Sequence, residues 1–148
     1  MRSRTMLIFK PDCLSGQGEV GLDALLGEVA EYGTEFGMRM EMAARIQLSK
    51  EMAARLYEEH RGKPFYDGLV GFMTSGPCLV SIWSCESGPA CLAGREVVRR
   101  IREKHGRDDL SETGPANLVH GSDSQDSADR EIRWAVKCFI LRCAEEGG

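Results

Sequence analysis

A histidine at position 120 stands where a short apolar run meets a predicted helix. Leu118 and Val119 fit a buried strand, and Ser122-x-x-Gln125 has the form of a capping box that opens a helix. Apolar residues then recur at helical spacing, at Ala128, Ile132, Ala135, Val136, Phe139 and Ile140. Free backbone N–H groups at such a junction bind anions, so we expect His120 to be exposed, reactive and suited to phosphate chemistry.

Phosphoryl transfer places further demands on such a site. It needs a nucleophile, positive charge around the migrating oxygens, and a geometry that keeps the attack in line. Neutral imidazole is a competent nucleophile near pH 7, and an acidic neighbour on its other nitrogen fixes the tautomer. A lone histidine more often satisfies a hydrogen bond in a protein core, so the other residues decide between the two interpretations.

Four blocks of the chain resemble the nucleoside diphosphate kinase family, in that family's order. His120-Gly121-Ser122-Asp123-Ser124, with Ser127-Ala128-x-x-Glu131-Ile132 after it, is similar to the active-site signature. The other blocks are residues 7–12 (LIFKPD), 61–66 (RGKPFY) and 69–77 (LVGFMTSGP). The resemblance implies that His120 carries the transferred phosphoryl group. It also implies Mg²⁺, held mostly by substrate phosphates and water rather than by protein ligands.

The resemblance implies two further catalytic residues. Glu131 follows His120 at the family's interval and would orient the imidazole, whereas its alternative interpretation is a solvated charge on a helix. Lys10 lies in the K-P-D context of the family and would bind phosphate, whereas its alternative is an ordinary surface lysine. We therefore expect His120, Glu131 and Lys10 to form the catalytic set.

The same resemblance extends the nucleotide-binding set. Tyr57 would lie beside the phosphates, Phe65 would stack on the base, and Asn117 would hydrogen-bond the ribose. Tyr57 and Phe65 are equally compatible with a hydrophobic core. Gly121 and Ser122 adjoin the histidine, and Ser122 would hydrogen-bond near it, cap the helix, or do both.

Arg95 and Arg102 are the expected phosphate-binding arginines of that set. Their assignment rests on Leu92-Ala93-Gly94-Arg95 and on the residues after Arg102. An alignment shifted by one helical turn selects Arg99 or Arg100 instead.

The segment between Trp83 and Asn117 departs from the family pattern. The run between the two arginines is shortened, the Gly-Glu-Thr-Asn-Pro turn that supplies a further phosphate contact is absent, and residues 111–116 look inserted. Many relatives build trimers and hexamers with this loop. A hexamer is therefore not assumed, and the resemblance favours a homodimer.

Composition and charge fit a single domain of 148 residues with its own core. The chain is 42% hydrophobic and 28% charged, with a net charge of −4, which gives no electrostatic case for nucleic acid as a partner. No apolar run approaches 18 residues, and the amino terminus lacks the apolar stretch of a signal peptide. We expect a cytoplasmic protein without a membrane partner.

The six cysteines favour reduced thiols over a disulfide or zinc site. No pair has C-x-x-C spacing, and only three histidines are present. Their neighbours are apolar or helical, which is typical of buried or half-buried thiols.

Strands and helices are predicted to alternate along the chain. Strands are expected at residues 6–9, 38–48, 78–83 and 117–120, and helices from Leu22, from Ser49 to Tyr57, from Phe65 to before Gly76, over 95–103 and after His120. This order suits an α+β fold of the ferredoxin-like kind, in which a four-stranded antiparallel sheet is covered by helices and a helical hairpin is inserted. Another α/β sandwich remains compatible with the pattern alone.

These features predict a nucleoside diphosphate kinase-like phosphotransferase that works in two in-line steps. A nucleoside triphosphate phosphorylates His120, and a nucleoside diphosphate then accepts the group. Two alternatives stay open: a nucleotide-binding or regulatory module that has lost turnover, and a kinase specialised for an unusual nucleotide.

Overall fold

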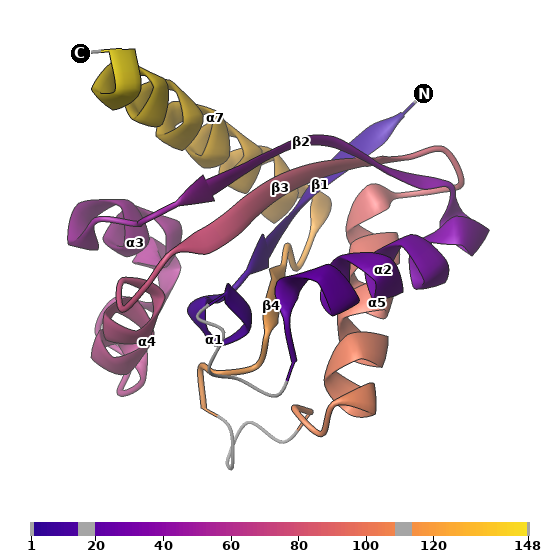
Figure 1. Ribbon diagram of the computed structural model, residues 1–148, viewed down its shortest axis with the longest axis horizontal. Helices are drawn as coiled ribbons and strands as arrows, with labels where there is room; N and C mark the ends of the chain where they lie inside the picture. The colour runs from indigo at the N-terminus through magenta and orange to yellow at the C-terminus, as the bar shows by residue number, and fades with distance from the viewer. Residues whose placement is uncertain (1, 15–19, 109–113, 148) are drawn as a thin grey trace.

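An antiparallel sheet of four strands runs through the centre of the molecule (Figure 1). The computed structural model describes residues 2–14, 20–108 and 114–147. The strands are β1 (Ser3–Phe9), β2 (Met38–Ile46), β3 (Cys78–Cys85) and β4 (Val119–Gly121), and their spatial order is β2-β3-β1-β4. Every neighbouring pair is antiparallel, so the predicted sheet is confirmed.

The described helices are α1 (Pro11–Leu14), α2 (Leu22–Gly33), η1 (Thr34–Phe36), α3 (Lys50–Leu56), η2 (Glu58–His60), α4 (Tyr66–Met73), α5 (Ala90–Lys104) and α7 (Gln125–Gly147). The predicted hairpin is confirmed as α3 and α4, and the Ser49 hydroxyl caps α3 by accepting from the Met52 N–H at 3.1 Å. The short helix α1 was not predicted. Helix α5 starts five residues earlier than expected, directly after Pro89, whose fixed φ suits a helix start.

Alternating side chains of β1 divide the core into two layers. Met6 and Ile8 pack with α3, α4 and α7 in one cluster, whereas Leu7 and Phe9 pack with α2 and α5 in the other. Successive residues of a strand point to opposite faces, so one short strand anchors both layers. Figure 1 shows the two helix groups on either side of the sheet.

The strand β2 forms an edge of this sheet. Its period-two pattern predicts a strand despite the helix preference of Met, Ala and Glu, and that prediction is confirmed. It pairs only with β3 among the described strands, with a register irregularity between Met40 and Met42. These two methionines are 42% and 49% exposed, so the edge presents apolar side chains outward.

The junction around His120 differs from the prediction in two ways. The strand is Val119–Gly121 rather than residues 117–120, so His120 lies in its middle, opposite Ile8 of β1. The helix cap is Ser124, whose hydroxyl accepts from the Ser127 N–H at 3.0 Å, and Ser122 is buried before it. Both serines satisfy the sequence rule for a cap, but β4 draws Ser122 into the protein.

The predicted insertion at residues 111–116 lies partly outside the described residues. All six cysteines are unpaired, and none of the described helices is both long and apolar enough to cross a membrane.

Candidate active site

His120 and Glu131 form a buried pair between β4 and α7. The Nε2 of His120 and the Oε1 of Glu131 form a short hydrogen bond, and the Glu131 side chain is only 5% exposed. Burial raises the pKa of Glu131, but the hydrogen bond from His120 outweighs it, and the net pKa lies below its usual value. Glu131 is therefore a carboxylate at neutral pH, and it can only accept a hydrogen bond.

This pairing determines which nitrogen of His120 is available. Because the carboxylate accepts, Nε2 carries the proton of the neutral ring and Nδ1 carries the lone pair. Nδ1 has no hydrogen-bond partner among the described residues, and the side chain is 20% exposed. The imidazole thus offers an oriented nucleophilic nitrogen to the outside.

Lys10 lies at the end of β1 and is 4% exposed. Its Nζ donates to the Oδ1 of Asn117 at 2.5 Å and to the carbonyl of Pro115 at 3.1 Å. Burial first, and the Arg102 guanidinium second, lower the pKa of Lys10 to about 7, against an opposing effect of Asp12. The predicted phosphate ligand is therefore a buried, readily titrated ammonium rather than a surface lysine.

Arg102 reaches from α5 to the same group. Its Nη2 donates to the carbonyl of Val119 at 2.6 Å and to the Oδ1 of Asn117 at 3.5 Å. Its Nε is buried without a hydrogen-bond partner among the described residues. Arg102 and Lys10 share the Asn117 oxygen, so two cations and one amide meet beside β4.

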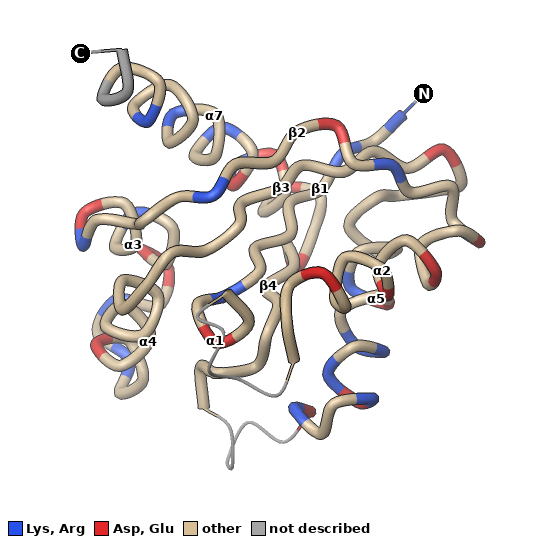
Figure 2. Tube along the Cα trace, in the orientation of Figure 1, with Lys and Arg blue, Asp and Glu red and all other residues tan. Residues whose placement is uncertain are grey.

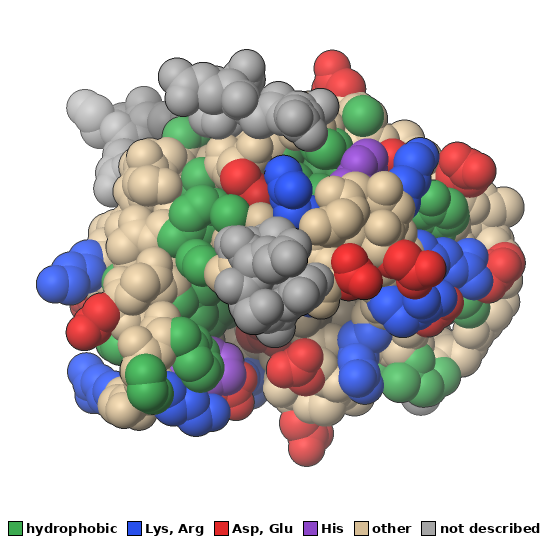
Figure 3. Space-filling model, turned by 90° about the horizontal axis from the view of Figure 1, so that it is seen from below, with side chains coloured by type: hydrophobic (Ala, Val, Ile, Leu, Met, Phe, Trp, Pro, Cys, Tyr) green, Lys and Arg blue, Asp and Glu red, His purple; other side chains and the backbone are tan. Residues whose placement is uncertain are grey.

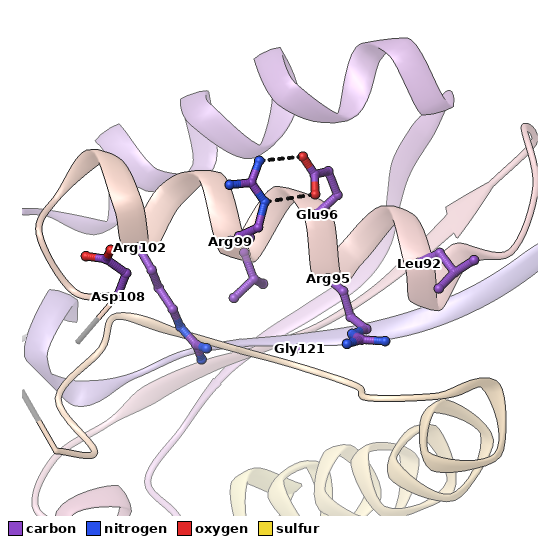
Figure 4. A pocket seen from close by; sticks show the side chains of 8 residues that line it. Leu92, Arg95, Glu96, Arg99, Arg102, Asp108 and Gly121 are labelled. Atoms are coloured by element: carbon purple, nitrogen blue, oxygen red, sulfur yellow. Dashed lines mark hydrogen bonds and ion pairs between the residues drawn. The ribbon is translucent and has the colours of Figure 1, made fainter. Parts of the chain in front are cut away.

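Arg95 lies further along α5 and borders a hollow of about 470 Å³. Figure 4 shows Arg95 and Arg102 extending from α5 toward the segment that carries Gly121. Arg95 is exposed and makes no hydrogen bond or ion pair with a described residue. Gly121 lines the same hollow, and a Cβ there would lie 3.1 Å from the Cγ2 of Val98, so this glycine permits the close approach of α5.

The competing arginines of α5 are engaged elsewhere, as the structure places them. Arg99 bonds Glu96 and Glu103, and Arg100 bonds Glu96 and Glu35. Lys and Arg recur along α5 in Figure 2, so composition alone does not separate them. Among Arg99, Arg100 and Arg102, only Arg102 hydrogen-bonds β4, which favours the alignment that selects Arg102.

An aromatic row links the histidine to the surface. The Tyr57 ring meets the His120 ring edge-on at 6.0 Å, His60 stacks on Tyr57 at 6.3 Å, and Phe65 meets His60 at 5.2 Å. Tyr57 is buried with an unpartnered hydroxyl, whereas Phe65 is 53% exposed. Phe65 is therefore not the core residue that its type alone allows.

Sequence reasoning missed two residues of this region. His60 connects Tyr57 with Phe65, and its only signal was its place just before the R-G-K-P-F-Y block. Asp12 accepts the Leu118 N–H at 3.1 Å, across 106 positions of sequence, and its signal was the K-P-D context. Burial raises the Asp12 pKa against the opposing effect of that hydrogen bond.

The fold and these contacts indicate a class of protein. An oriented histidine beside buried cations and an exposed aromatic ring suits transfer of a phosphoryl group from a nucleotide. The profile of the family described as nucleoside diphosphate kinase matches residues 3–138. The chain belongs to the nucleoside diphosphate kinase family.

Individual relatives cover nearly the whole chain. The nucleoside diphosphate kinase of Nitrosococcus oceani is 36% identical over 139 residues, which are 90% of this chain and 91% of that protein. That of Methanocaldococcus jannaschii is 33% identical over 142 residues, or 93% and 95%. A Halobacterium salinarum nucleoside diphosphate kinase in complex with CDP shares 30% identity, with a TM-score of 0.63 and coverage of 90% and 87%.

Solved structures of the family share the fold of this chain. A crystal structure of the Aquifex aeolicus nucleoside diphosphate kinase superposes with a TM-score of 0.66 at 26% identity, covering 91% of this chain and 95% of that one. The predicted family, the ferredoxin-like fold and the class of nucleoside diphosphate kinase-like phosphotransferase are confirmed. The roles of single residues stay predictions.

Proposed function

We propose that this protein moves the γ-phosphoryl group of a nucleoside triphosphate to a nucleoside diphosphate through a phosphohistidine at His120. A single domain performs both half-reactions. The observation that carries the proposal is the His120–Glu131 pair, because it leaves Nδ1 with a lone pair and no partner among the described residues. Glu131 also stabilises the positive charge that the ring gains when Nδ1 attacks.

The surrounding residues divide between the two parts of a nucleotide. Lys10, Arg102 and Arg95 supply positive charge for the phosphates, and Asn117 supplies an amide for the ribose. Phe65 offers an exposed π-face on which any base can stack. Figure 3 shows hydrophobic side chains gathered in the left half of this face, with Lys, Arg, Asp and Glu side chains on both sides of it.

Mg²⁺ enters this proposal as part of the substrate. The described residues contain no group of three or more His, Cys, Asp or Glu side chains arranged to hold a metal ion. The carboxylate nearest the nucleophile, Glu131, is already bonded to His120. We infer that the substrate phosphates and water hold the ion, because Mg²⁺ parts reluctantly with its hydration shell.

Mass spectrometry after brief incubation with ATP and Mg²⁺ tests the proposal directly. We expect one acid-labile phosphoryl group on His120, and a chase with a nucleoside diphosphate should discharge it. ATP binding without this adduct would reject the kinase and leave a nucleotide-binding module. A normal adduct that common diphosphates discharge only slowly would instead indicate a specialised acceptor.

We further propose that the protein forms a homodimer through the exposed edge of β2. An edge strand with unpaired backbone groups and outward methionines is a surface that proteins normally cover. Light scattering should give twice the chain mass, and Met42→Lys should shift it toward the monomer. The cytoplasmic location, and the lack of nucleic-acid and membrane partners, stay predictions.

A further inference from the structure

A strained turn precedes the strand that carries His120. Leu118 has φ of +73°, and it is the only residue other than glycine with positive φ among those the structure describes. The Val119 N–H donates to the Asn117 carbonyl at 2.9 Å, which closes a three-residue γ-turn around Leu118. This form of the γ-turn, with positive φ at its centre, is rare and strained. A bulky residue holds it only when its surroundings impose it.

The segment after β1 imposes this conformation from both sides of Leu118. The Oδ2 of Asp12 accepts the Leu118 N–H at 3.1 Å, and the Lys10 N–H donates to the Leu118 carbonyl at 2.8 Å. The Leu118 side chain is 1% exposed and packs in the core. Asp12 is thus the one side-chain oxygen among the described residues that holds the strained peptide N–H.

The turn determines where the nucleotide-binding groups lie. Asn117 begins it and presents its Oδ1 to Lys10 and Arg102, while Val119 ends it and opens the strand that carries His120. Relaxing Leu118 to negative φ would rotate Asn117 relative to His120. Displacements of about 1 Å at a reacting centre can lower a rate about a hundredfold.

We propose that Asp12 is a positioning residue for the phosphoryl transfer, acting through its hydrogen bond to the strained Leu118 peptide. The inference rests on the proposed function, but it concerns a residue that touches neither substrate nor the reacting nitrogen. The carboxylate holds the turn, and the turn holds Asn117 and Lys10 in register with His120.

Two substitutions separate the hydrogen bond from the charge. Asp12→Ala removes the acceptor, whereas Asp12→Asn keeps a carbonyl oxygen and removes the charge. Ser49→Ala is the matched control, because Ser49 also accepts one backbone N–H at 3.1 Å, at the start of α3. For each protein we would measure amide exchange at Leu118, ADP affinity, and the rate of His120 phosphorylation in a single turnover.

Asp12→Ala should speed exchange at Leu118 and slow phosphorylation by about tenfold or more, with weaker ADP binding. Asp12→Asn should keep exchange at Leu118 within about threefold of the unchanged protein. It should also keep the phosphorylation rate in that range when measured below pH 7, because loss of the Asp12 charge lowers the Lys10 pKa further. Ser49→Ala should keep the phosphorylation rate within the same range. If Asp12→Ala does not fold, Asp12→Leu, which is similar in size and lacks an acceptor, takes its place. An unaltered rate in the acceptor-free variant, or an equal loss in Asp12→Asn, would overturn the proposal.

Failure of the kinase proposal and failure of the Asp12 role give different results. If the unchanged protein forms no phosphohistidine, the kinase proposal fails. Exchange at Leu118 and ADP affinity still report whether Asp12 holds the turn, because neither requires turnover. Equal exchange in all the proteins would reject the role of Asp12 even if the kinase proposal holds.

Discussion

Two histidine–glutamate pairs of similar burial occur in this molecule. His120 and Glu131 join β4 to α7, with side chains 20% and 5% exposed. His105 and Glu28 join the end of α5 to α2, with side chains 17% and 10% exposed, and the His105 Nε2 lies 2.9 Å from both Glu28 oxygens. Pairing and burial therefore do not distinguish His120, the proposed nucleophile, from His105.

The surroundings of the two pairs differ in chemistry. Glu28 also binds Lys104 at 2.9 Å, and His105 caps the carboxyl end of α5, where a positive charge is stabilised. That pair links two helices and has no aromatic row or buried cation pair around it in the described part of the chain. His120 instead touches Tyr57 and lies on the strand next to the Lys10, Arg102 and Asn117 group.

Replacing His120 gives the largest expected difference between the pairs. His120→Ala should lower phosphoryl transfer by about a thousandfold or more, because no other nucleophile takes its place. His105→Ala should keep transfer within about threefold, since the contacts of His105 link α5 to Glu28 of α2. Coupled assays of purified proteins, with circular dichroism as a check on folding, measure both. Substantial transfer by His120→Ala would reject the nucleophile.

The two glutamates provide the next test. Glu131→Gln should slow His120 phosphorylation on the order of a hundredfold, because the imidazole loses both its orientation and the charge that stabilises it. ADP affinity should change little, since Glu131 is buried and bonded to His120. Rapid-quench measurements give the rate, and calorimetry gives the affinity. An unaltered rate would remove Glu131 from the mechanism.

Lys10, near the His120–Glu131 pair, predicts that ADP affinity depends on pH. The His105–Glu28 pair has no such lysine effect on ADP affinity. The Lys10 pKa of about 7 means that the free protein loses this charge as pH rises through 7. Phosphate binding requires the charged form, so ADP affinity should fall by at most about tenfold per pH unit from 7 to 9. Lys10→Gln should bind more weakly and lose this slope. A flat profile in the unchanged protein would contradict the prediction.

The smallest effect on activity is expected at Glu28. Glu28→Gln should lower the free energy of unfolding by about 1–3 kcal/mol through its buried contacts, and should leave transfer within about twofold. Burial raises the pKa of Glu28. Hydrogen bonds and charges of Lys104 and His105 lower it by more, so the net pKa is below the usual value of 4.5. The stabilisation is therefore present above that value and lost as pH falls below it. Thermal unfolding at pH 7 and pH 3 should show the difference between the two proteins shrinking in acid.

The arginines of α5 show why the sequence left two alignments open. Arg95, Arg99 and Arg102 are four and three positions apart, so they share one face of a helix. Sequence spacing therefore cannot select among them. The choice depends on Glu96 and Glu103, which engage Arg99, and on the Val119 carbonyl, which engages Arg102.

The prediction that Ser122 caps α7 was wrong for a similar reason. Ser122 and Ser124 both have the side chain that a cap needs, and the capping-box rule prefers Ser122 because Gln125 lies three residues after it. The pairing of β4 with β1 extends through Gly121, which places Ser122 in the interior and leaves Ser124 to cap. The strand pairing overrides the local rule.

The features that could be predicted from the sequence are those whose causes are local. The alternation in β2, the helical hairpin, the K-P-D context of Lys10 and the signature around His120 depend on neighbouring side chains. The positive φ of Leu118 and the hydrogen bond from Arg102 to the Val119 carbonyl arose only in the tertiary structure. These depend on contacts between distant segments, such as the Asp12–Leu118 hydrogen bond, and no local pattern records which segments will meet.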